Sequence, residues 1–262
     1  MTKKSTLENS KISGLIITYN EEKHIDNVIE NISFVDEIIV VDSFSTDHTP
    51  AKLKKHDRVK VIQRAFKNFS DQRNFAIQQA QYPWILFIDA DERISKELRS
   101  EILETVNNPL GFVAFKFPRK FVFKDKIIRF SGLQTDFIYR LFKKGSSHYK
   151  KDRTVHEELK VNGKSKTLSN IMLHYSFSNY ESYKQKTEHY AILKAQELFE
   201  QGEKPTIFDF HIKPAYKFLY NYIIRLGFLD GKAGYTICNL NAYGVKYRFK
   251  ELEKLISGSP KK

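Results

Sequence analysis

The sequence predicts an α/β fold: a mostly parallel, Rossmann-like central sheet with helices on both faces, followed by a C-terminal helical extension. Over the first 106 of the 262 residues, short continuous apolar runs alternate with stretches of helical period. Continuous rather than alternating apolar strands are typical of parallel sheets that are covered on both faces. Helical patterns return from residue 179. We therefore expect a core over residues 1–178 and an extension over residues 179–262.

Four strands and three helices are expected in the first half of the core. The strands are expected at residues 12–18, 37–41, 59–63 and 84–88. Asn20, Ser70 and Ser95 are suited to cap the helices, because a short polar side chain there accepts a hydrogen bond from the first helical turn. The helix after Ser95 is expected to present one apolar face, with Leu98, Ile102, Leu103 and Val106.

Beyond residue 111 the pattern changes twice. Apolar and basic residues first alternate, which predicts half-exposed antiparallel strands. A long helix is then expected from Asn179 to about Gln201, with Gly202 as its stop, and a second helix is expected to begin near Lys213–Pro214.

The second of these helices has an amphipathic pattern. Apolar residues recur at spacings of three and four between Ile212 and Leu226, while Lys213, Lys217 and Arg225 share the other side. A basic amphipathic helix can lie on an anionic membrane surface. Its apolar face can also pack on the core or on a partner subunit, and that is the more ordinary use of such a stripe.

The net charge of +13 is unevenly distributed along the chain. Residues 1–115 hold 15 Lys and Arg against 17 Asp and Glu, whereas residues 116–262 hold 29 against 14. The first part thus carries a charge of −2 and the second +15, so the second is expected to meet a phospholipid, a phosphorylated acceptor or nucleic acid. A lysine-rich solvated surface is the simpler alternative.

Cysteine content and hydropathy indicate a cytoplasmic protein. The single cysteine, Cys238, excludes an internal disulfide and fits a reducing compartment. The N-terminal residues 1–14 lack the apolar segment of a signal peptide, and the sequence has no apolar run long enough to span a membrane.

Two carboxylates close the fourth strand in the stretch WILFIDADERI, residues 84–94. Asp89 and Asp91 would point the same way along an extended strand, and like charges so close disfavour each other's ionisation. A divalent cation such as Mg²⁺ or Mn²⁺, completed by phosphate oxygens and water, would relieve that repulsion. The alternative is an acidic helix start before Ser95; the position at the end of a buried strand favours the cation.

Further polar side chains follow the first two strands and so fall at the same sheet edge. The turn TYNEE, residues 18–22, follows the first strand, and Asp42 and Ser45 follow the second. Arg73 and Asn74 lie in the first turns of the helix expected after Ser70, where an anion is favoured. Ordinary polar turns, helix caps and surface residues are the alternative. Residues 18–22 contain no glycine, which excludes a dinucleotide-binding G-x-G-x-x-G motif and a P-loop there.

The blocks LIITYNEE, EIIVVDSFSTDHT, FSDQRNFAI and WILFIDADE resemble, in order, those of inverting family 2 glycosyltransferases with the GT-A fold. The later blocks YRLFKKG, TVHEEL, LHYSFSNYESYKQKTEHYA and RLGFLDGKAGY are similar to the lipopolysaccharide-core glucosyltransferase branch. The resemblance covers roughly residues 12 to 250. Its first four blocks are specific for the superfamily, and the later ones for the branch but not for one sugar.

The resemblance implies a role for each matching residue. Asp42 would hold the base of the nucleotide, Asp89 the ribose, and Asp91 a divalent metal (Mn²⁺ or Mg²⁺), with Asp89 and His174 as further metal candidates. A lone histidine after an apolar run is also often structural. The other implied donor-binding residues are Thr18, Tyr19, Asn20, Glu21, Ser45, Arg73 and Asn74.

The catalytic base and the acceptor side are also implied by the resemblance. Glu157 occupies the place where the family usually has an Asp as base, which is a departure from its pattern, and Asp136 is the rival. Arg140 and His156 would face the acceptor or a phosphate.

The expected function is transfer of a hexose, with inversion, from a nucleotide sugar such as a UDP-sugar to a lipid-linked or lipopolysaccharide-core acceptor at the inner face of a membrane. A family 2 transferase acting on another glycan or on a protein is the first alternative. A non-catalytic nucleic-acid-binding protein is the second, indicated by charge alone, without an identifiable recognition motif.

Overall fold

The computed structural model describes residues 10–134, 136–150, 158–177 and 179–258. The chain forms two compact units, the first comprising Met1–Arg119 and Asp136–His174, and the second Lys120–Thr135 and Tyr175–Lys262. The second unit therefore includes residues 120–135, which lie within the expected core of residues 1–178.

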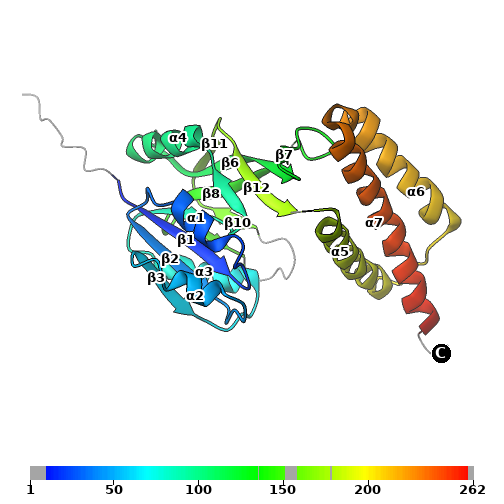
Figure 1. The fold of residues 1–262 in the computed structure, drawn as a ribbon, viewed down its shortest axis with the longest axis horizontal. Coiled ribbons are helices and arrows are strands. Elements are labelled where there is room, and N and C mark those ends of the chain that lie inside the picture. Colours follow the sequence, from blue (N-terminus) through cyan, green and yellow to red (C-terminus); the bar gives the residue numbers. More distant parts are fainter. Residues whose placement is uncertain (1–9, 135, 151–157, 178, 259–262) are drawn as a thin grey trace, which may run out of the picture. The chain divides into compact units, whose positions relative to one another are not determined.

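The first unit contains four parallel strands in the order β3-β2-β1-β4 (Figure 1). Their bounds are β1 Ile12–Thr18, β2 Glu37–Asp42, β3 Val59–Gln63 and β4 Trp84–Phe87, each within one residue of the prediction. Thr18 is in register with Asp42. The carboxyl ends of β1, β2 and β4 thus meet at one edge of the sheet, where ligands bind in such folds.

The sheet continues from β4 through antiparallel strands. β8 (Phe137–Lys143) pairs with β4, β6 (Phe112–Phe123) pairs with β8, and the order ends with β12 (Met172–Phe177) and β5 (Glu92–Ile94). The shorter strands are β7 (Lys126–Ile127), β9 (Ser147–Tyr149), β10 (Leu159–Val161) and β11 (Lys164–Thr167). The predicted α/β class is confirmed, with a mixed sheet in which the four N-terminal strands are parallel and β11 also pairs in parallel with β6.

Helices cover both faces of this sheet. Alternate residues of β4 point to opposite sides: Trp84 and Leu86 belong to one core cluster, and Ile85 and Phe87 to the other. The first cluster also holds apolar residues of α1 (Ile25–Asn31), α2 (Thr49–Leu53) and α4 (Lys96–Asn107), and the second those of α3 (Phe69–Gln79). Each face of β4 is therefore sealed from water, which explains its uninterrupted apolar sequence.

One of the three predicted N-caps of this unit is correct. The Ser95 side chain accepts a hydrogen bond from the Leu98 backbone, and three of the four predicted apolar residues of α4 are buried, Leu103 being 38% exposed. The caps at Asn20 and Ser70 were wrong. Helix α1 begins after His24, four residues beyond Asn20. Asn20 itself has a left-handed φ of 57°, and its side chain accepts a hydrogen bond from the loop after β2 instead of capping the helix. Asn68, not Ser70, caps α3.

The second unit is mainly helical. α5 (Tyr180–Glu200) begins at a capping box formed by Asn179 and Ser182, which confirms the first predicted helix. The second predicted start was wrong, because α6 runs from Ile207 to Leu219 with a capping box at Thr206 and contains Pro214. The chain continues as a π-helical segment η1 (Tyr220–Ile224), a 3-10 segment η2 (Gly227–Asp230) and α7 (Gly231–Gly258). The stripe from Ile212 to Leu226 is therefore not one α-helix.

One apolar cluster and the buried carboxylate of Asp230 link the strands of the second unit to its helices. Phe123 and Ile128 of the β6–β7 region pack with Tyr183 of α5 and with Ile237 and Leu240 of α7. The Asp230 side chain, 2% exposed, accepts hydrogen bonds from the backbone amides of residues 129 and 130 and from the hydroxyl of residue 131. Among the described residues, no helix is both long and apolar enough to cross a membrane.

Candidate functional site

The two polar loops after β1 and β2 bind each other. The Asn20 backbone amide donates to Ser45 Oγ at 2.8 Å, and Asn20 Oδ1 accepts from the Thr46 amide at 2.8 Å. The Glu21 amide donates to Thr49 Oγ1, also at 2.8 Å. The left-handed conformation of Asn20 allows this reciprocal contact, and the sequence-predicted residues of both loops are therefore brought together.

The Asp42 side chain stabilises the loop that follows β2. It is 1% exposed and accepts hydrogen bonds from the amide and the hydroxyl of Ser45, at 3.0 and 2.5 Å. These bonds shape the second loop, at whose surface Phe44 is 53% exposed with a φ of 60°. Tyr19, from the first loop, is 58% exposed, whereas Thr18 is buried. The exposed aromatic faces are thus Tyr19 and Phe44, of which only Tyr19 was singled out from the sequence.

Asp89 is neutralised by arginines rather than left for a cation. Its Oδ1 accepts from Arg73 at 2.8 Å, and its Oδ2 accepts a short hydrogen bond from Arg140. Arg73 reaches Asp89 from α3 and lies over the rings of Phe87 and Tyr149. Arg140, expected near an acceptor or a phosphate, is 1% exposed and pairs with Asp89. Both guanidinium groups hold the Asp89 carboxylate in place.

The ion pairs continue from Arg140 to the strands beside β4. Arg140 also donates to Glu92 Oε1 at 2.7 Å, and Arg119 donates to the same oxygen at 3.0 Å. Arg119 Nε in turn donates to Asp136 Oδ2 at 2.6 Å. Glu92 is fully buried, and its Oε2 accepts from the Asp89 amide, which fixes the turn between the two carboxylates. A buried charge requires such partners.

The electrostatics of this network favour its charged form. Burial by itself raises the pKa of Asp89, but the positive charges of Arg140 and Arg73 outweigh burial and lower that pKa far below its usual range. Burial likewise opposes the charge of Arg140, whereas Asp89 and Glu92 raise its pKa. Asp89 is therefore ionised at neutral pH.

Asp91 has a different partner. The His174 Nε2 atom of β12 lies 3.0 Å from Asp91 Oδ2, and the register of β12 with β5 places His174 opposite Glu92. His24 is close enough that Asp91 acts on its titration: burial and Arg93 lower the pKa of His24, and Asp91 opposes them. His24 is therefore neutral near pH 7, beside a carboxylate and a second imidazole.

The residues fit a divalent cation at Asp91 and His174 better than at Asp89. A carboxylate oxygen and an imidazole nitrogen are both donors that Mn²⁺ accepts, and they already face each other. Each Asp89 oxygen, by contrast, accepts from an arginine. The part of the chain that is described holds no group of three or more His, Cys, Asp or Glu side chains arranged for a metal. A cation at this pair would need further donors from a ligand.

The Asn74 side chain is hydrogen-bonded to the backbone of Tyr149. Its amide nitrogen donates to the Tyr149 carbonyl at 2.8 Å, and its oxygen accepts from the Tyr149 amide at 2.9 Å. The side chain thus joins α3 to β9, and through Tyr149 it supports the ring beneath Arg73. Glu157 and His156, expected as base and acceptor contact, lie outside the described residues.

Sequence reasoning missed several residues of this site. Glu92, Arg119 and His24 were not singled out, because their partners come from strands distant along the chain. Glu92 directly follows the two aspartates, and an acidic residue that is fully buried has to be paired. The one available signal was the run of three carboxylates in DADE within an otherwise buried stretch.

Comparisons with known proteins identify the family of the chain. Residues 13–165, more than half of the chain, match the family model described as Glycosyl transferase family 2. The chain is 31% identical over 258 residues to an uncharacterized glycosyltransferase of Rickettsia typhi, covering 94% of this chain and 87% of that protein. It is 27% identical to the lipopolysaccharide core biosynthesis glycosyltransferase LpsC of Rhizobium meliloti, over 84% of this chain and 82% of LpsC.

Among solved structures, the chain is similar to S. aureus TarS 1-349 in complex with UDP-GlcNAc, with 16% identity and a TM-score of 0.49, over 96% of this chain and 93% of that one. The match to the family model and the relative from Rickettsia typhi decide the assignment. The chain belongs to glycosyltransferase family 2.

Proposed function

We propose that the protein transfers a hexose, with inversion, from a nucleotide sugar to a lipid-linked or lipopolysaccharide-core acceptor, with a divalent cation held by Asp91 and His174. UDP-sugars are the first donor candidates. The observation that carries the proposal is the contact between His174 and Asp91 beside the ionised Asp89, at the sheet edge where β4 ends. That edge is where ligands of α/β sheets bind.

The donor side of the mechanism follows from charge. Asp91 and His174 would hold the divalent cation, which would supply positive charge to stabilise the nucleoside diphosphate as leaving group. Asp89, kept ionised by Arg73 and Arg140, offers a fixed acceptor for ribose hydroxyls. Tyr19 and Phe44 are exposed at the loops that Asp42 and Ser45 shape, where a base can stack.

The acceptor side needs one base. Glu157 removes the proton of the acceptor hydroxyl as that oxygen attacks the anomeric carbon, and the bond to the diphosphate breaks on the opposite face. A single displacement of this kind inverts the configuration and requires no protein nucleophile. Asp136 is the weaker candidate, because accepting a proton would cost it the ion pair with Arg119.

The acceptor assignment rests on similarity and charge. LpsC, the Rhizobium meliloti relative, carries lipopolysaccharide core biosynthesis in its name. Residues 116–262 hold 29 Lys and Arg against 14 Asp and Glu, which favours an acceptor or membrane surface that bears phosphates. We place the protein in the cytoplasm at the inner face of the membrane, with the basic C-terminal extension in peripheral contact.

A thermal-shift screen tests the donor proposal. UDP-, GDP- and dTDP-sugars are compared with and without Mn²⁺, since a ligand at 100 times its Kd stabilises the folded state by about 2.7 kcal/mol. One nucleotide sugar should raise the melting temperature only when Mn²⁺ is present. If none of them does so, the proposal fails.

The acceptor is tested separately. The stabilising donor, with a labelled sugar, is offered to truncated lipopolysaccharide core, to another bacterial glycan and to a protein acceptor. Label should enter the core lipid. Mass spectrometry of the product should show one added hexose, and NMR coupling at its anomeric carbon should show the inverted configuration. Label entering only the other glycan or the protein would establish the alternative family 2 activity.

A further inference from the structure

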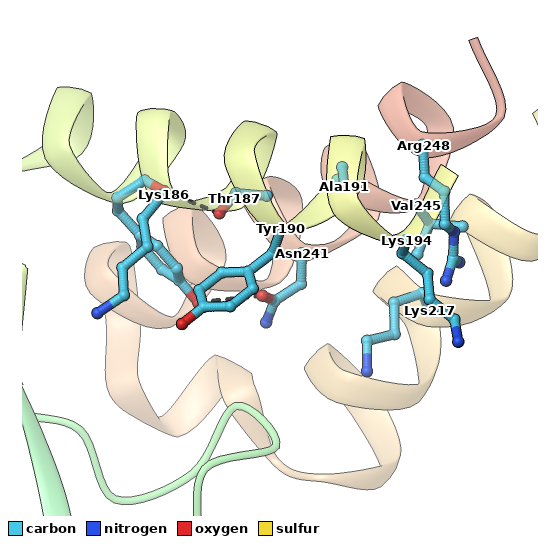
Figure 2. Close-up of a pocket in the computed structure, with 11 residues that line it drawn as sticks. Lys186, Thr187, Tyr190, Ala191, Lys194, Lys217, Asn241, Val245 and Arg248 are labelled. Atoms are coloured by element: carbon cyan, nitrogen blue, oxygen red, sulfur yellow. Dashed lines mark hydrogen bonds between the residues drawn. The ribbon is translucent and has the colours of Figure 1, made fainter. Parts of the chain in front are cut away.

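The C-terminal unit contains a basic groove between α5 and α7, which Lys217 of α6 also lines (Figure 2). Its volume is about 310 Å³, enough for a small polar headgroup. None of its lining residues belongs to the candidate donor site. The lining residues are Tyr183, Lys186, Thr187, Tyr190, Ala191, Lys194, Lys217, Asn241, Gly244, Val245 and Arg248.

Four cationic side chains and no carboxylate line the basic groove. Figure 2 shows Lys194, Lys217 and Arg248 gathered at one end, and Lys186 at the other. Three different helices supply the cations at the first end, so their convergence comes from the packing of the unit and not from a local run of lysines.

Arg248 lacks the acidic partner that a half-buried cation normally has. Within the described ranges, neither Arg248 nor Lys217 has a carboxylate within salt-bridge distance, and Arg248 Nε is buried without a hydrogen-bond partner. Burial lowers the pKa of Arg248, opposed only by Asp209. Asp209 itself is bound to Lys213 at 2.5 Å. An anion in the groove would supply the missing partner.

The middle of the basic groove offers neutral hydrogen-bond donors. The buried Tyr183 hydroxyl donates to Asn241 Oδ1 at 3.0 Å, which leaves the Asn241 amide nitrogen as a donor. Gly244 lets α7 approach α5 closely, since a Cβ there would lie 2.5 Å from Thr187 Cγ2. A larger residue at this position would therefore force the two helices that form the groove apart.

We infer that the basic groove binds the phosphate group of an anionic lipid. The inference rests on the proposed location at the membrane and names the residues that recognise the membrane lipid. Phosphate is favoured because Lys194, Lys217 and Arg248 line the same end of the groove, and of these only Lys194 has a carboxylate within salt-bridge distance among the described residues, Glu197 at 2.7 Å. A lipid source is favoured because the same unit exposes large apolar side chains: Ile207, Phe208, Ile212, Tyr216, Leu219 and Ile223.

The shape and lining of the basic groove disfavour nucleic acid. Binding of a single strand uses a series of aromatic side chains on which successive bases stack. Tyr190 is the one tyrosine that is both exposed and part of the lining, since Tyr183 is buried. The pocket has room for one phosphate and its headgroup rather than for a strand.

Vesicle sedimentation tests the inference with the full chain. The double variant Lys217→Gln/Arg248→Gln is compared with Lys232→Gln/Lys250→Gln, which removes two exposed charges of α7 that do not line the groove. With phosphatidylcholine vesicles that contain phosphatidylglycerol, the groove variant should bind about 10-fold or more weakly than wild type, and the control should change by no more than about threefold. Binding of the wild-type protein to pure phosphatidylcholine should be weak.

Several results would overturn the inference. Equal losses in the two double variants would show a diffuse surface charge effect, and no preference for phosphatidylglycerol would exclude lipid phosphate. Stabilisation of the wild-type protein by inorganic phosphate, without vesicle binding, would show a site for free phosphate. Tighter binding to single-stranded DNA that is lost in the groove variant would show a nucleic-acid site.

Two further measurements distinguish a loss of lipid binding from a loss of the fold or of donor binding. Circular dichroism confirms the fold of each variant, and Arg248→Lys, which retains the charge, should keep most of the vesicle binding. The groove variant should retain donor-dependent stabilisation by nucleotide sugar with Mn²⁺. Loss of vesicle binding with donor binding intact would therefore concern the groove alone, whereas absence of donor binding in the wild-type protein would concern the proposed function alone.

Discussion

The imidazole of His174 lies 3.0 Å from the Asp91 carboxylate, although 83 residues separate the two along the chain. The pairing of β12 with β5 produces this contact by placing His174 opposite the residue that follows Asp91. It gives the second carboxylate of the D-x-D stretch a partner that can also bind a cation, while the first carboxylate is occupied by arginines.

His174→Ala should weaken Mn²⁺-dependent binding of the donor nucleotide by about 10-fold or more, because the cation would lose one of its two protein donors. Asp91→Asn should abolish that dependence while leaving the fold intact. Calorimetric titration of nucleotide at several Mn²⁺ concentrations measures both effects. His211→Ala, at an exposed position of α6, serves as the control. Unchanged Mn²⁺ dependence in the His174 variant would assign that residue a purely structural role.

Arg140→Met should be severely destabilising. The variant leaves the buried Glu92 and the partly buried Asp89 without their common partner, which costs about 3–5 kcal/mol for a broken buried ion pair. Arg140→Lys should recover part of this loss, because an ammonium group restores the charge but not the two-sided contact. Urea unfolding gives the free energies, with the exposed Arg58→Met as the control. A loss below about 1 kcal/mol would contradict the structural role given to Arg140.

Acid should remove the contribution of Asp89 to stability. Because its folded-state pKa lies below the unfolded value, the ionised carboxylate stabilises the protein above the unfolded pKa of about 4. The difference in unfolding free energy between wild type and Asp89→Asn should therefore be constant above about pH 5 and shrink as the pH falls below about 4. Urea midpoints measured from pH 7 downwards test this. A difference that grows on acidification would mean that the pKa is raised, not lowered.

Glu157→Gln should keep donor binding and lose transfer, by about 10²–10⁴-fold in kcat, because only proton removal from the acceptor is affected. Asp136→Asn should cost less, since in the structure Asp136 pairs with Arg119. Single-turnover transfer and thermal shift with donor separate chemistry from binding. The assignment reverses if Asp136→Asn abolishes transfer with donor binding intact while Glu157→Gln remains active.

Gly234→Ala should destabilise the helical unit. A Cβ at this position in α7 would lie 2.0 Å from the backbone oxygen of Gly227, and backbone cannot yield as a flexible side chain does. The expected cost is about 1–3 kcal/mol in the unfolding of this unit, followed by circular dichroism. Gly258→Ala, in the last turn of the same helix with open space around it, is the matched control and should be nearly neutral. Equal stability of the two variants would show that α7 does not approach the Gly227 backbone of η2 this closely.

Local chemistry determined much of this protein from the sequence alone. The four parallel strands, the cap at Ser95, the helix from Asn179, and the place of Asp42, Asp89 and Asp91 at the carboxyl ends of strands followed from apolar runs and short-range hydrogen bonds. Such features depend on residues within a few positions of each other. For the same reason the sequence could show that two carboxylates end a buried strand and must be compensated.

Only the tertiary structure decided how they are compensated. The sequence favoured one divalent cation between Asp89 and Asp91. In the fold, Asp89 pairs with Arg73 and Arg140, and His174 lies beside Asp91. These partners come from α3, β8 and β12. Asn20, which has a left-handed φ, contacts the loop after β2 instead of capping a helix. Charge–charge energies depend on distance in space and on burial, which a linear pattern does not contain. The roles of Arg140, Glu92 and Arg119 therefore became visible only when distant strands were paired.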